Sequence, residues 1–87
     1  MAKFFIPAQL KDLTSGIDCV EFDAATVRDA LAELDRRFPG IKQRLCENDE
    51  LSPALQVSIN GEMSSQGMYA KIPPDGEVHF LPAIGGG

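Results

Sequence analysis

Hydrophobic and polar residues alternate in four short segments of the chain, and a period of two is typical of half-buried β-strands. The segments are residues 3–6, 18–22, 55–59 and 77–81. Turn-forming residues at 11–16 separate the first two segments, so we expect those two strands to pair antiparallel as a hairpin. The alternation predicts that each strand has one face toward a core and one face away from it.

The predicted faces divide the apolar side chains of the strands into two groups. Those expected in the core are Phe4, Ile6, Val20, Phe22, Leu55, Val57, Ile59, Val78 and Phe80. Phe5, His79 and Leu81 alternate with them and therefore point the other way. If the first and last strands lie side by side in the centre of a sheet, these three side chains form one exposed cluster.

Residues 27–38 carry the pattern of an amphipathic helix. Thr26 can cap its first turn, and Asp29 three residues later completes a pair resembling a capping box. The apolar stripe consists of Val27, Ala30, Leu31, Leu34 and Phe38. Pro39-Gly40 ends the helix. The charged residues between the apolar positions, including Glu33 and Arg37, indicate a solvated face rather than a reactive site.

The remaining segments are predicted to be mostly turns and loops. Residues 41–46 suit one short helical turn, and Glu47–Glu50 reads as an acidic loop. Asn60-Gly61 and Pro74–Gly76 are strong turn formers. Residues 62–72 are expected to be irregular, with Met63, Met68 and Tyr69 packing at the edge of the core. One helical stripe and alternating strands together predict a two-layer α+β domain spanning residues 1–87.

Composition and charge narrow the class of protein. The 87 residues are 44% hydrophobic and 24% charged, which is ordinary for a globular domain. The net charge of −5 and the absence of a basic cluster argue against nucleic acid and favour a protein partner with a basic surface. No segment has the length of a membrane span or the pattern of a secretion leader, so we expect a cytoplasmic protein without a membrane partner.

Candidate catalytic groups are scarce. The chain contains no phosphate-binding loop, zinc-binding motif or nucleophile elbow, and His79 is its single histidine. Cys19 and Cys46 form no CxxC pair and are expected to be reduced thiols. We therefore expect neither a catalytic residue nor a metal or cofactor site. Without reactive side chains of its own, the chain suits a carrier or a substrate better than an enzyme.

The C-terminus carries the one candidate reactive group of the chain. An apolar strand leads into the tail 82–87, which ends in Gly85-Gly86-Gly87 and a free carboxylate. Glycine has no Cβ, so such a tail is flexible and thin enough to enter a narrow channel. One hypothesis makes the carboxylate of Gly87 the reactive group; the alternative is an end of the chain without a function.

Four features, the ending among them, extend this pattern to the whole chain. They are the strand order, the segments Val57–Glu62 and Asp75–Val78, and the ending Phe80–Gly87. In these the chain resembles the MoaD/ThiS family of sulfur carrier proteins, which includes the small subunit of molybdopterin synthase. Residues 38–53 look closest to the branch that contains carriers for cysteine biosynthesis. Gly85 departs from the pattern as a third glycine, which should loosen the tail.

The resemblance implies a ubiquitin-like β-grasp fold, with a mixed sheet of four to five strands on one main helix. It also implies that a partner enzyme of the ubiquitin-activating type adenylates Gly87 with ATP. A sulfur donor or sulfurtransferase then converts the carboxylate to a thiocarboxylate, and a sulfur-accepting synthase is the downstream partner. ATP would belong to the activating partner, and this chain would bind no cofactor.

The residues expected to bind the partner are those around the tail. Leu81 matches the hydrophobic position that the family has just before the tail, and Phe5 and His79 lie beside it on the predicted exposed face. Pro82 and Ile84 would set the direction in which the tail leaves, and Gly85, Gly86 and Gly87 would enter the partner's channel. The alternative is that Phe5 and Leu81 are scattered surface residues, which are common.

Three functions remain open from the sequence. The first is sulfur carriage for a cofactor, an amino acid or another thio-metabolite. The second is protein modification, in which the activated Gly87 acylates a lysine. The third is a β-grasp module that binds partners without covalent chemistry. The first two share the adenylate and differ only in the nucleophile that attacks it.

Overall fold

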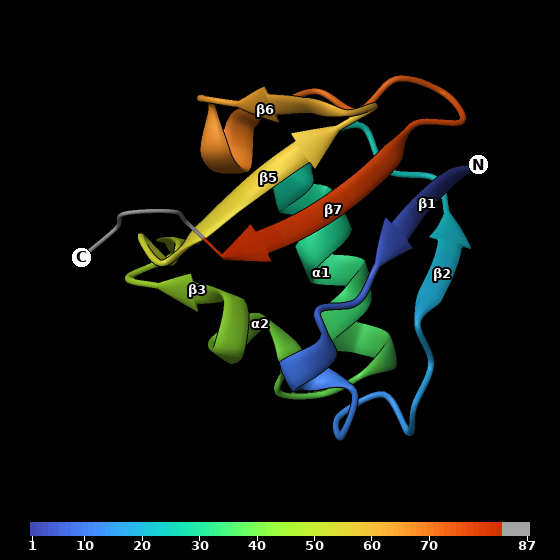
Figure 1. Ribbon diagram of the computed structural model, residues 1–87, viewed down its shortest axis with the longest axis vertical. Coiled ribbons are helices and arrows are strands. Elements are labelled where there is room, and N and C mark those ends of the chain that lie inside the picture. Colours follow the sequence, from blue (N-terminus) through green and yellow to red (C-terminus); the bar gives the residue numbers. More distant parts are fainter. Residues whose placement is uncertain (83–87) are drawn as a thin grey trace.

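A five-stranded mixed sheet and one main helix form the two layers of the protein in a computed structural model that describes residues 1–82 (Figure 1). The strands are β1 (Ala2–Phe5), β2 (Cys19–Phe22), β5 (Leu55–Ile59), β6 (Glu62–Ser64) and β7 (Glu77–Pro82). Their order across the sheet is β2-β1-β7-β5-β6. The predicted α+β, ubiquitin-like β-grasp architecture is confirmed, with five strands in the sheet.

The pairing of the strands places the first and last strands side by side, with the last strand in the centre of the sheet, which meets the condition under which Phe5, His79 and Leu81 share one face. β1 pairs with β2 antiparallel and with β7 parallel, while β5 pairs antiparallel with both β7 and β6. A 3-10 turn, η1 (Ala8–Leu10), lies in the connection from β1 to β2. β7 is therefore held on both sides, and it is the strand that leads to the C-terminal residues.

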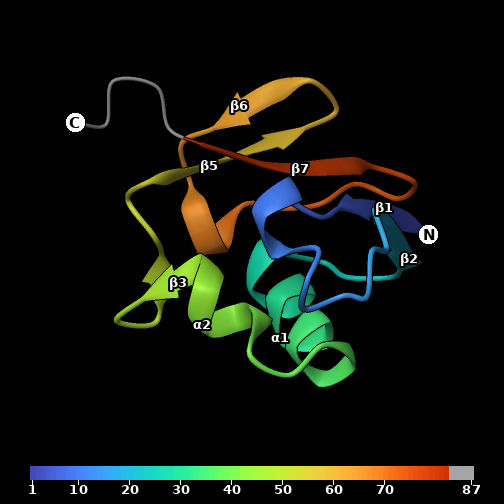
Figure 2. The same ribbon diagram turned by 60° about the horizontal axis from the view of Figure 1, so that its bottom comes forward.

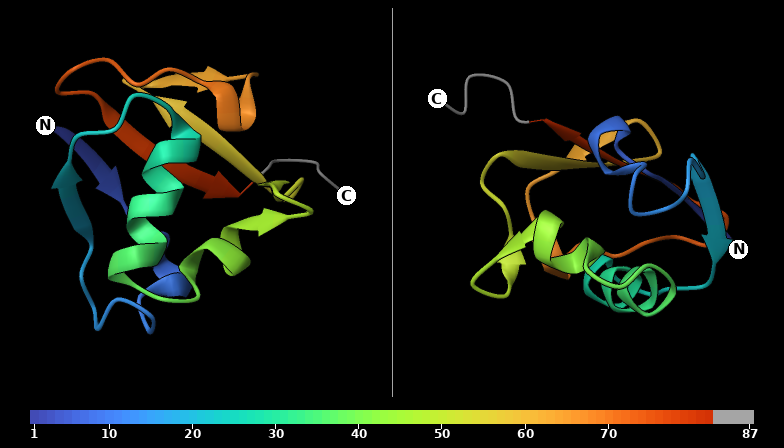
Figure 3. Two further views of the ribbon diagram at one scale, coloured as in Figure 1. Left: turned by 180° about the vertical axis from the view of Figure 1, so that it is seen from behind. Right: turned by 90° about the horizontal axis from the view of Figure 1, so that it is seen from below.

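Helices α1 (Val27–Arg37) and α2 (Ile41–Leu45) lie on the same side of the sheet (Figures 2 and 3). Thr26 caps α1, since its side-chain oxygen accepts a hydrogen bond from the backbone N–H of Asp29 at 3.2 Å. Gly40 has a φ of 98°, which starts α2 in a new direction. One carboxylate oxygen of Asp35 accepts hydrogen bonds from the backbone N–H groups of Gly40 and Lys42. These bonds fix α2 against the end of α1.

The core lies between this helical layer and the sheet. Phe4 and Phe22 stack inside it with ring centroids 4.3 Å apart, and the guanidinium of Arg37 covers the Phe22 ring at 4.9 Å. The largest fully buried apolar side chains are Phe4, Val27, Leu31, Leu34, Ile41, Leu45, Val57 and Val78. The predicted helical stripe and the inward faces of the strands therefore form one hydrophobic core.

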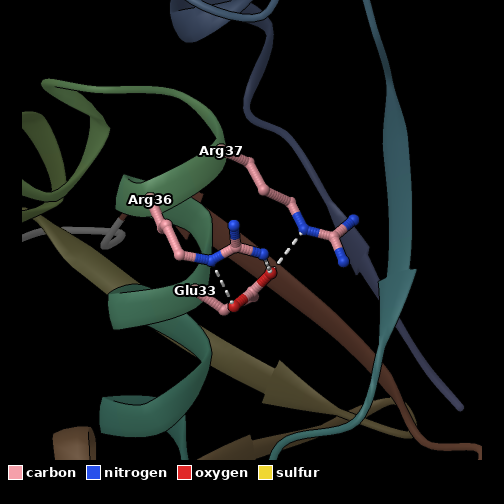
Figure 4. Close-up of polar contacts among 3 residues, drawn as sticks. All are labelled: Glu33, Arg36 and Arg37. Atoms are coloured by element: carbon pink, nitrogen blue, oxygen red, sulfur yellow. Dashed lines mark hydrogen bonds and ion pairs between the residues drawn. The ribbon is translucent and has the colours of Figure 1, made fainter.

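The exposed face of α1 carries an ion-pair cluster. Glu33 accepts hydrogen bonds from Arg36 Nε at 3.0 Å and from Arg37 Nε at 2.7 Å (Figure 4). These two arginines, Arg36 first, lower the pKa of Glu33 to about 2. The cluster lies on the solvent side of the helix, as expected for a solvated charged face.

Two expectations about the region before β7 were wrong. Residues 62–72 are not irregular: they contain β6 and the 3-10 turn η2 (Gly67–Tyr69). Met68 is buried, but Met63 is 55% exposed and Tyr69 73% exposed, so neither is part of the core. Met63 is exposed because the two-residue turn at Asn60-Gly61 folds β6 back onto β5, which places Met63 opposite Ser58 on the uncovered face.

The acidic segment is also more ordered than a loop. β3 (Cys46–Glu47) and β4 (Glu50–Leu51) pair antiparallel as a small hairpin. Asn48 and Asp49 form its turn, with φ values of 53° and 63°. Asparagine and aspartate adopt positive φ more readily than other residues, so these side chains serve the turn.

Candidate functional site

The face of the sheet opposite the helices carries the candidate site, and β7 crosses it in the centre (Figure 2). In the register of the sheet, His79 lies opposite Phe5 of β1 and opposite Ser58 of β5. Leu81 lies opposite Gln56 of β5. Residues paired in this way place their side chains on the same face. The structure thus brings Phe5, His79 and Leu81 to one face, as predicted.

Phe5 and His79 are in direct contact. Their rings stack with centroids 4.2 Å apart and planes 5° from parallel. Both side chains are half-buried, as is Leu81. A shallow groove of about 580 Å³ runs along β7 here, lined by Ser58, Asn60, Gly61, Glu77, His79 and Leu81. The exposed face therefore has an ordered apolar centre and a groove beside it.

The strand leading to the tail is paired up to its last residue. Pro82 ends β7, and its backbone lies opposite Leu55. Ile84, Gly85, Gly86 and Gly87, which the sequence assigns to the tail, lie outside the described residues. Five residues follow Pro82, and a chain of that length spans at most about 17 Å.

Neither cysteine is an activated nucleophile. Both are free and half-buried, and they lie on different elements, Cys19 in β2 and Cys46 in β3. Burial raises the pKa of both thiols above the ordinary value, and the nearby Glu21 raises that of Cys19 further. A raised pKa keeps a thiol protonated and poorly nucleophilic near neutral pH.

The described part of the chain offers no other reactive cluster. Within residues 1–82, no group of three or more His, Cys, Asp or Glu side chains could hold a metal ion. No helix among these residues is long and apolar enough to cross a membrane. A second hollow of about 670 Å³ lies away from β7, and charges of both signs line it, including Arg28, Lys42 and Asp49.

Met63 is the residue of this face that the sequence reasoning placed incorrectly. It pairs with Ser58, which pairs with His79, so Met63 lies on the same face as the Phe5–His79 stack. The signal was present in the sequence. A two-residue Asn-Gly turn pairs Ile59 with Glu62, and counting one further residue along each strand places Met63 opposite Ser58.

Comparison with known proteins identifies the family to which the chain belongs. Residues 5–87 match the model of the ThiS family. Small archaeal modifier protein 3 of Haloferax volcanii is 33% identical over 67 residues, covering 75% of this chain and 73% of that protein.

Two solved structures resemble the whole fold. A chain of the Amycolatopsis orientalis BexX/CysO complex is 31% identical with a TM-score of 0.89, and the match covers 100% of both chains. CysO of Mycobacterium tuberculosis is 25% identical with a TM-score of 0.86, covering 97% of this chain and 100% of that one. The family match includes the terminal glycines as well as the strands from β2 to β7. The chain belongs to the ThiS family of ubiquitin-like β-grasp sulfur carriers.

Proposed function

We propose that this protein carries sulfur as a thiocarboxylate on Gly87, after a partner enzyme has activated that carboxylate with ATP. The observation that carries the proposal is the match to the ThiS family, which extends through residue 87. The structure supports it in a second way, because the strand before the tail is the central strand of the sheet. A partner that grips this sheet holds the base of the tail at the same time.

The chemistry assigns one role to this chain and the rest to the partner. A carboxylate oxygen of Gly87 attacks the α-phosphorus of ATP and releases pyrophosphate, which leaves an acyl adenylate. A sulfide nucleophile then attacks the acyl carbon and displaces AMP, and the product is the thiocarboxylate. Neither step oxidises or reduces the carbon. The three glycines serve this reaction because they have no Cβ, and a Cβ next to the acyl carbon would collide with the wall of the partner's channel.

The docking surface for the activating enzyme is centred on Phe5, His79 and Leu81. The Phe5–His79 stack is already ordered, so little side-chain entropy is lost when a partner covers it. Pro82 and Ile84 connect this surface to Gly85, Gly86 and Gly87. ATP binds to the partner, and the chain itself acts as the acyl substrate without a catalytic residue or bound cofactor.

Intact-mass analysis tests the proposal. The protein is incubated with an adenylating enzyme of this class, ATP and sulfide, beside a control without ATP and a chain lacking Gly86-Gly87. The full-length chain should exchange one oxygen for sulfur only when ATP is present, and the truncated chain should remain unchanged. A full-length chain that keeps its mass under all conditions would refute the proposal and leave a non-covalent binding role.

Protein modification is a second candidate function, favoured by the 33% identity to a small archaeal modifier protein. It uses the same adenylate, but a lysine amine replaces sulfide as the nucleophile. Incubation with ATP, the activating enzyme and candidate acceptor proteins without sulfide distinguishes the two. An isopeptide bond between Gly87 and a lysine would show that the chain is also a modifier.

A further inference from the structure

β2 forms one outer edge of the sheet. The strand order is β2-β1-β7-β5-β6, so β2 has a paired neighbour on one side only (Figures 1 and 3). The hydrogen bonds of an antiparallel pair use every second residue of each strand. The N–H of Ile6 donates to the carbonyl oxygen of Asp18 at 2.8 Å, so the hydrogen-bonded positions lie at two-residue steps from this pair, as at Phe4 and Val20.

Cys19 and Glu21 lie between these positions and direct their backbone groups to the open edge. They are opposite Phe5 and Lys3, at positions where two strands turn their N–H and C=O groups away from each other. Lys3 shows this alternation on β1, since its N–H donates to the far side, to the carbonyl oxygen of Gly76. Within residues 1–82, no backbone hydrogen bond satisfies Cys19 or Glu21. The edge therefore presents backbone donors and acceptors at the spacing of a strand.

The side chains along this edge are acidic. Glu21 and Asp23 are exposed, the side chain of Asp23 to 88%. Glu21 has no ion pair among the described residues, and Asp23 lies 3.9 Å from the amine of Met1. Asp18 pairs with Lys11 at 2.5 Å. The described residues therefore neutralise the negative charge of the edge only in part.

The sign of the charge alternates across the sheet beside Glu21. Glu21, Lys3 and Glu77 lie opposite one another on β2, β1 and β7, so the row reads negative, positive, negative. Opposite charges at facing positions stabilise a sheet, and like charges destabilise it. A strand added outside β2 continues this alternation when it has a cation opposite Glu21. Cys19 belongs to the next row, beside the aromatic stack, where an apolar side chain is the matching neighbour.

We propose that β2 accepts an added strand from a basic partner, as an extended segment of another protein that pairs antiparallel with residues 18–23. The partner has Lys or Arg opposite Glu21. Its residue opposite Cys19 is apolar and comes two positions later, because the two strands run in opposite directions. A second cation fits opposite Asp23, two positions earlier. This inference goes beyond the proposed function, since it requires neither ATP nor the carboxylate of Gly87.

A second copy of this chain fits the edge poorly. Two β2 strands related by a twofold axis bring the same residues to both sides of the interface. The carboxylates of Asp18, Glu21 and Asp23 would then face those of the other copy, and the net charge of −5 on each chain adds to the repulsion. A basic segment supplies the opposite charge, so the acidic edge selects a different protein.

The backbone and the side chains contribute differently to this binding. Hydrogen bonds from the main chain of Cys19 and Glu21 supply affinity for any extended segment, and the side chains at alternate positions supply specificity. The contact of a partner cation with Glu21 is exposed, so salt screens it. Binding should therefore have one component that depends on backbone hydrogen bonds and another that weakens as ionic strength increases.

NMR titration of the isotope-labelled chain with a blocked peptide of sequence TKTKTVT tests the pairing. The central lysine is designed to lie opposite Glu21 and the valine opposite Cys19. The amide signals of Cys19 and Glu21 should shift, and their protons should exchange with water more slowly. N-methylation of the central lysine removes the donor to the carbonyl of Glu21 and should weaken binding about tenfold or more. N-methylation of the next threonine, whose N–H points away from β2, is the matched control and should change Kd by less than about threefold.

Variants of the chain test the role of charge. Glu21→Gln should raise Kd for the peptide roughly twofold to fivefold at low salt, and the effect should shrink as salt is added. Glu21→Lys should raise Kd further, because it places like charges at facing positions. Glu62→Gln removes the same charge from an exposed residue of β6, at the opposite edge of the sheet, and should leave Kd within about 1.5-fold of the wild-type value. Denaturant unfolding of each variant shows that the fold is retained.

The outcomes separate this inference from its alternatives. Failure of the peptide to bind, equal binding by the two N-methylated peptides, or amide shifts at β6 or β7 in place of β2 would each refute strand addition at β2. If sedimentation shows a dimer of the isolated chain that Glu21→Lys dissociates, a second copy occupies the edge and the inference is overturned. None of these measurements involves activation of Gly87, so the carrier function stands or falls separately.

Discussion

Phe5 and His79 stack face to face across two parallel neighbouring strands, with ring centroids 4.2 Å apart. The first residues of the chain and the strand that leads to its C-terminus thus contact each other on the face that the helices leave uncovered. A double-mutant cycle of Phe5→Ala and His79→Ala should show a coupling free energy of about 0.5–1.5 kcal/mol in denaturant unfolding. A coupling of zero would mean that the rings are neighbours without interaction.

Leu81 tests whether the uncovered face docks the activating enzyme. Leu81→Glu should lose most of the binding to that enzyme, because it places a charge in the apolar surface beside the stack. The free energy of unfolding should fall by less than about 1 kcal/mol, since Leu81 is only half-buried. Tyr69→Glu adds the same charge at an exposed side chain that lines the hollow beside α1 and α2. Equal binding by the two variants would support scattered surface residues instead of a docking site.

Gly76 sets the start of the tail-bearing strand. A Cβ at this position would lie 3.0 Å from the carbonyl oxygen of Pro73 and 3.3 Å from its ring, and the backbone N–H of Gly76 donates a hydrogen bond to that same oxygen. Gly76→Ala should therefore lower the free energy of unfolding by roughly 1–3 kcal/mol. Gly61→Asn is the comparison, because that site has open space, so any loss of stability there reports the cost of a positive φ and not of a steric contact. Unchanged stability in Gly76→Ala would show that the turn relaxes.

Glu33 makes the free energy of unfolding depend on pH. Its pKa is lowered from 4.5 to about 2 by Arg36 and Arg37, so the folded state favours the ionised carboxylate. The resulting stabilisation is complete above the unfolded pKa and is lost as pH falls through this window. The difference in unfolding free energy between wild type and Glu33→Gln should therefore be present near neutral pH, diminish as the pH falls below about 4.5, and be lost only below about pH 2. It should also shrink with added salt, because the cluster is exposed.

Glu62→Gln is the matched control for this pH series. Glu62 is exposed and makes no ion pair within the described residues. Its variant should differ little from wild type across the same window. If the difference in unfolding free energy between wild type and Glu33→Gln stayed the same in acid, Glu33 would contribute through packing and not through its charge.

Much of the fold follows from local patterns in the sequence. The helix is predictable because a Thr26 cap, a five-residue apolar stripe and a Pro39-Gly40 stop agree with one another, and all three appear in the structure. The faces of the strands are predictable because the period of two is unbroken around Val57 and Val78. The central position of β7 does not follow from local patterns, because tertiary packing determines which strands become neighbours.

The errors came from short elements with weak patterns. Met63 and Tyr69 are large apolar residues in a segment with few periodic neighbours, so hydrophobicity suggested burial where the register and the 3-10 turn give exposure. The hairpin of β3 and β4 has two residues in each strand, too few for a period to be visible. In the candidate site, the grouping of Phe5, His79 and Leu81 was predictable, and the extension to Met63 was not recognised.

Position-specific mass analysis tests the central claim that sulfur is carried on Gly87. A variant with Cys19→Ser and Cys46→Ser is treated with the activating enzyme, ATP and sulfide, digested, and compared with wild type. Both chains should yield a C-terminal fragment in which one oxygen of Gly87 is replaced by sulfur, because the half-buried thiols, whose pKa values are raised, take no part in the chemistry. Sulfur that appears on the cysteines of wild type and is absent from the cysteine-free variant would contradict the account.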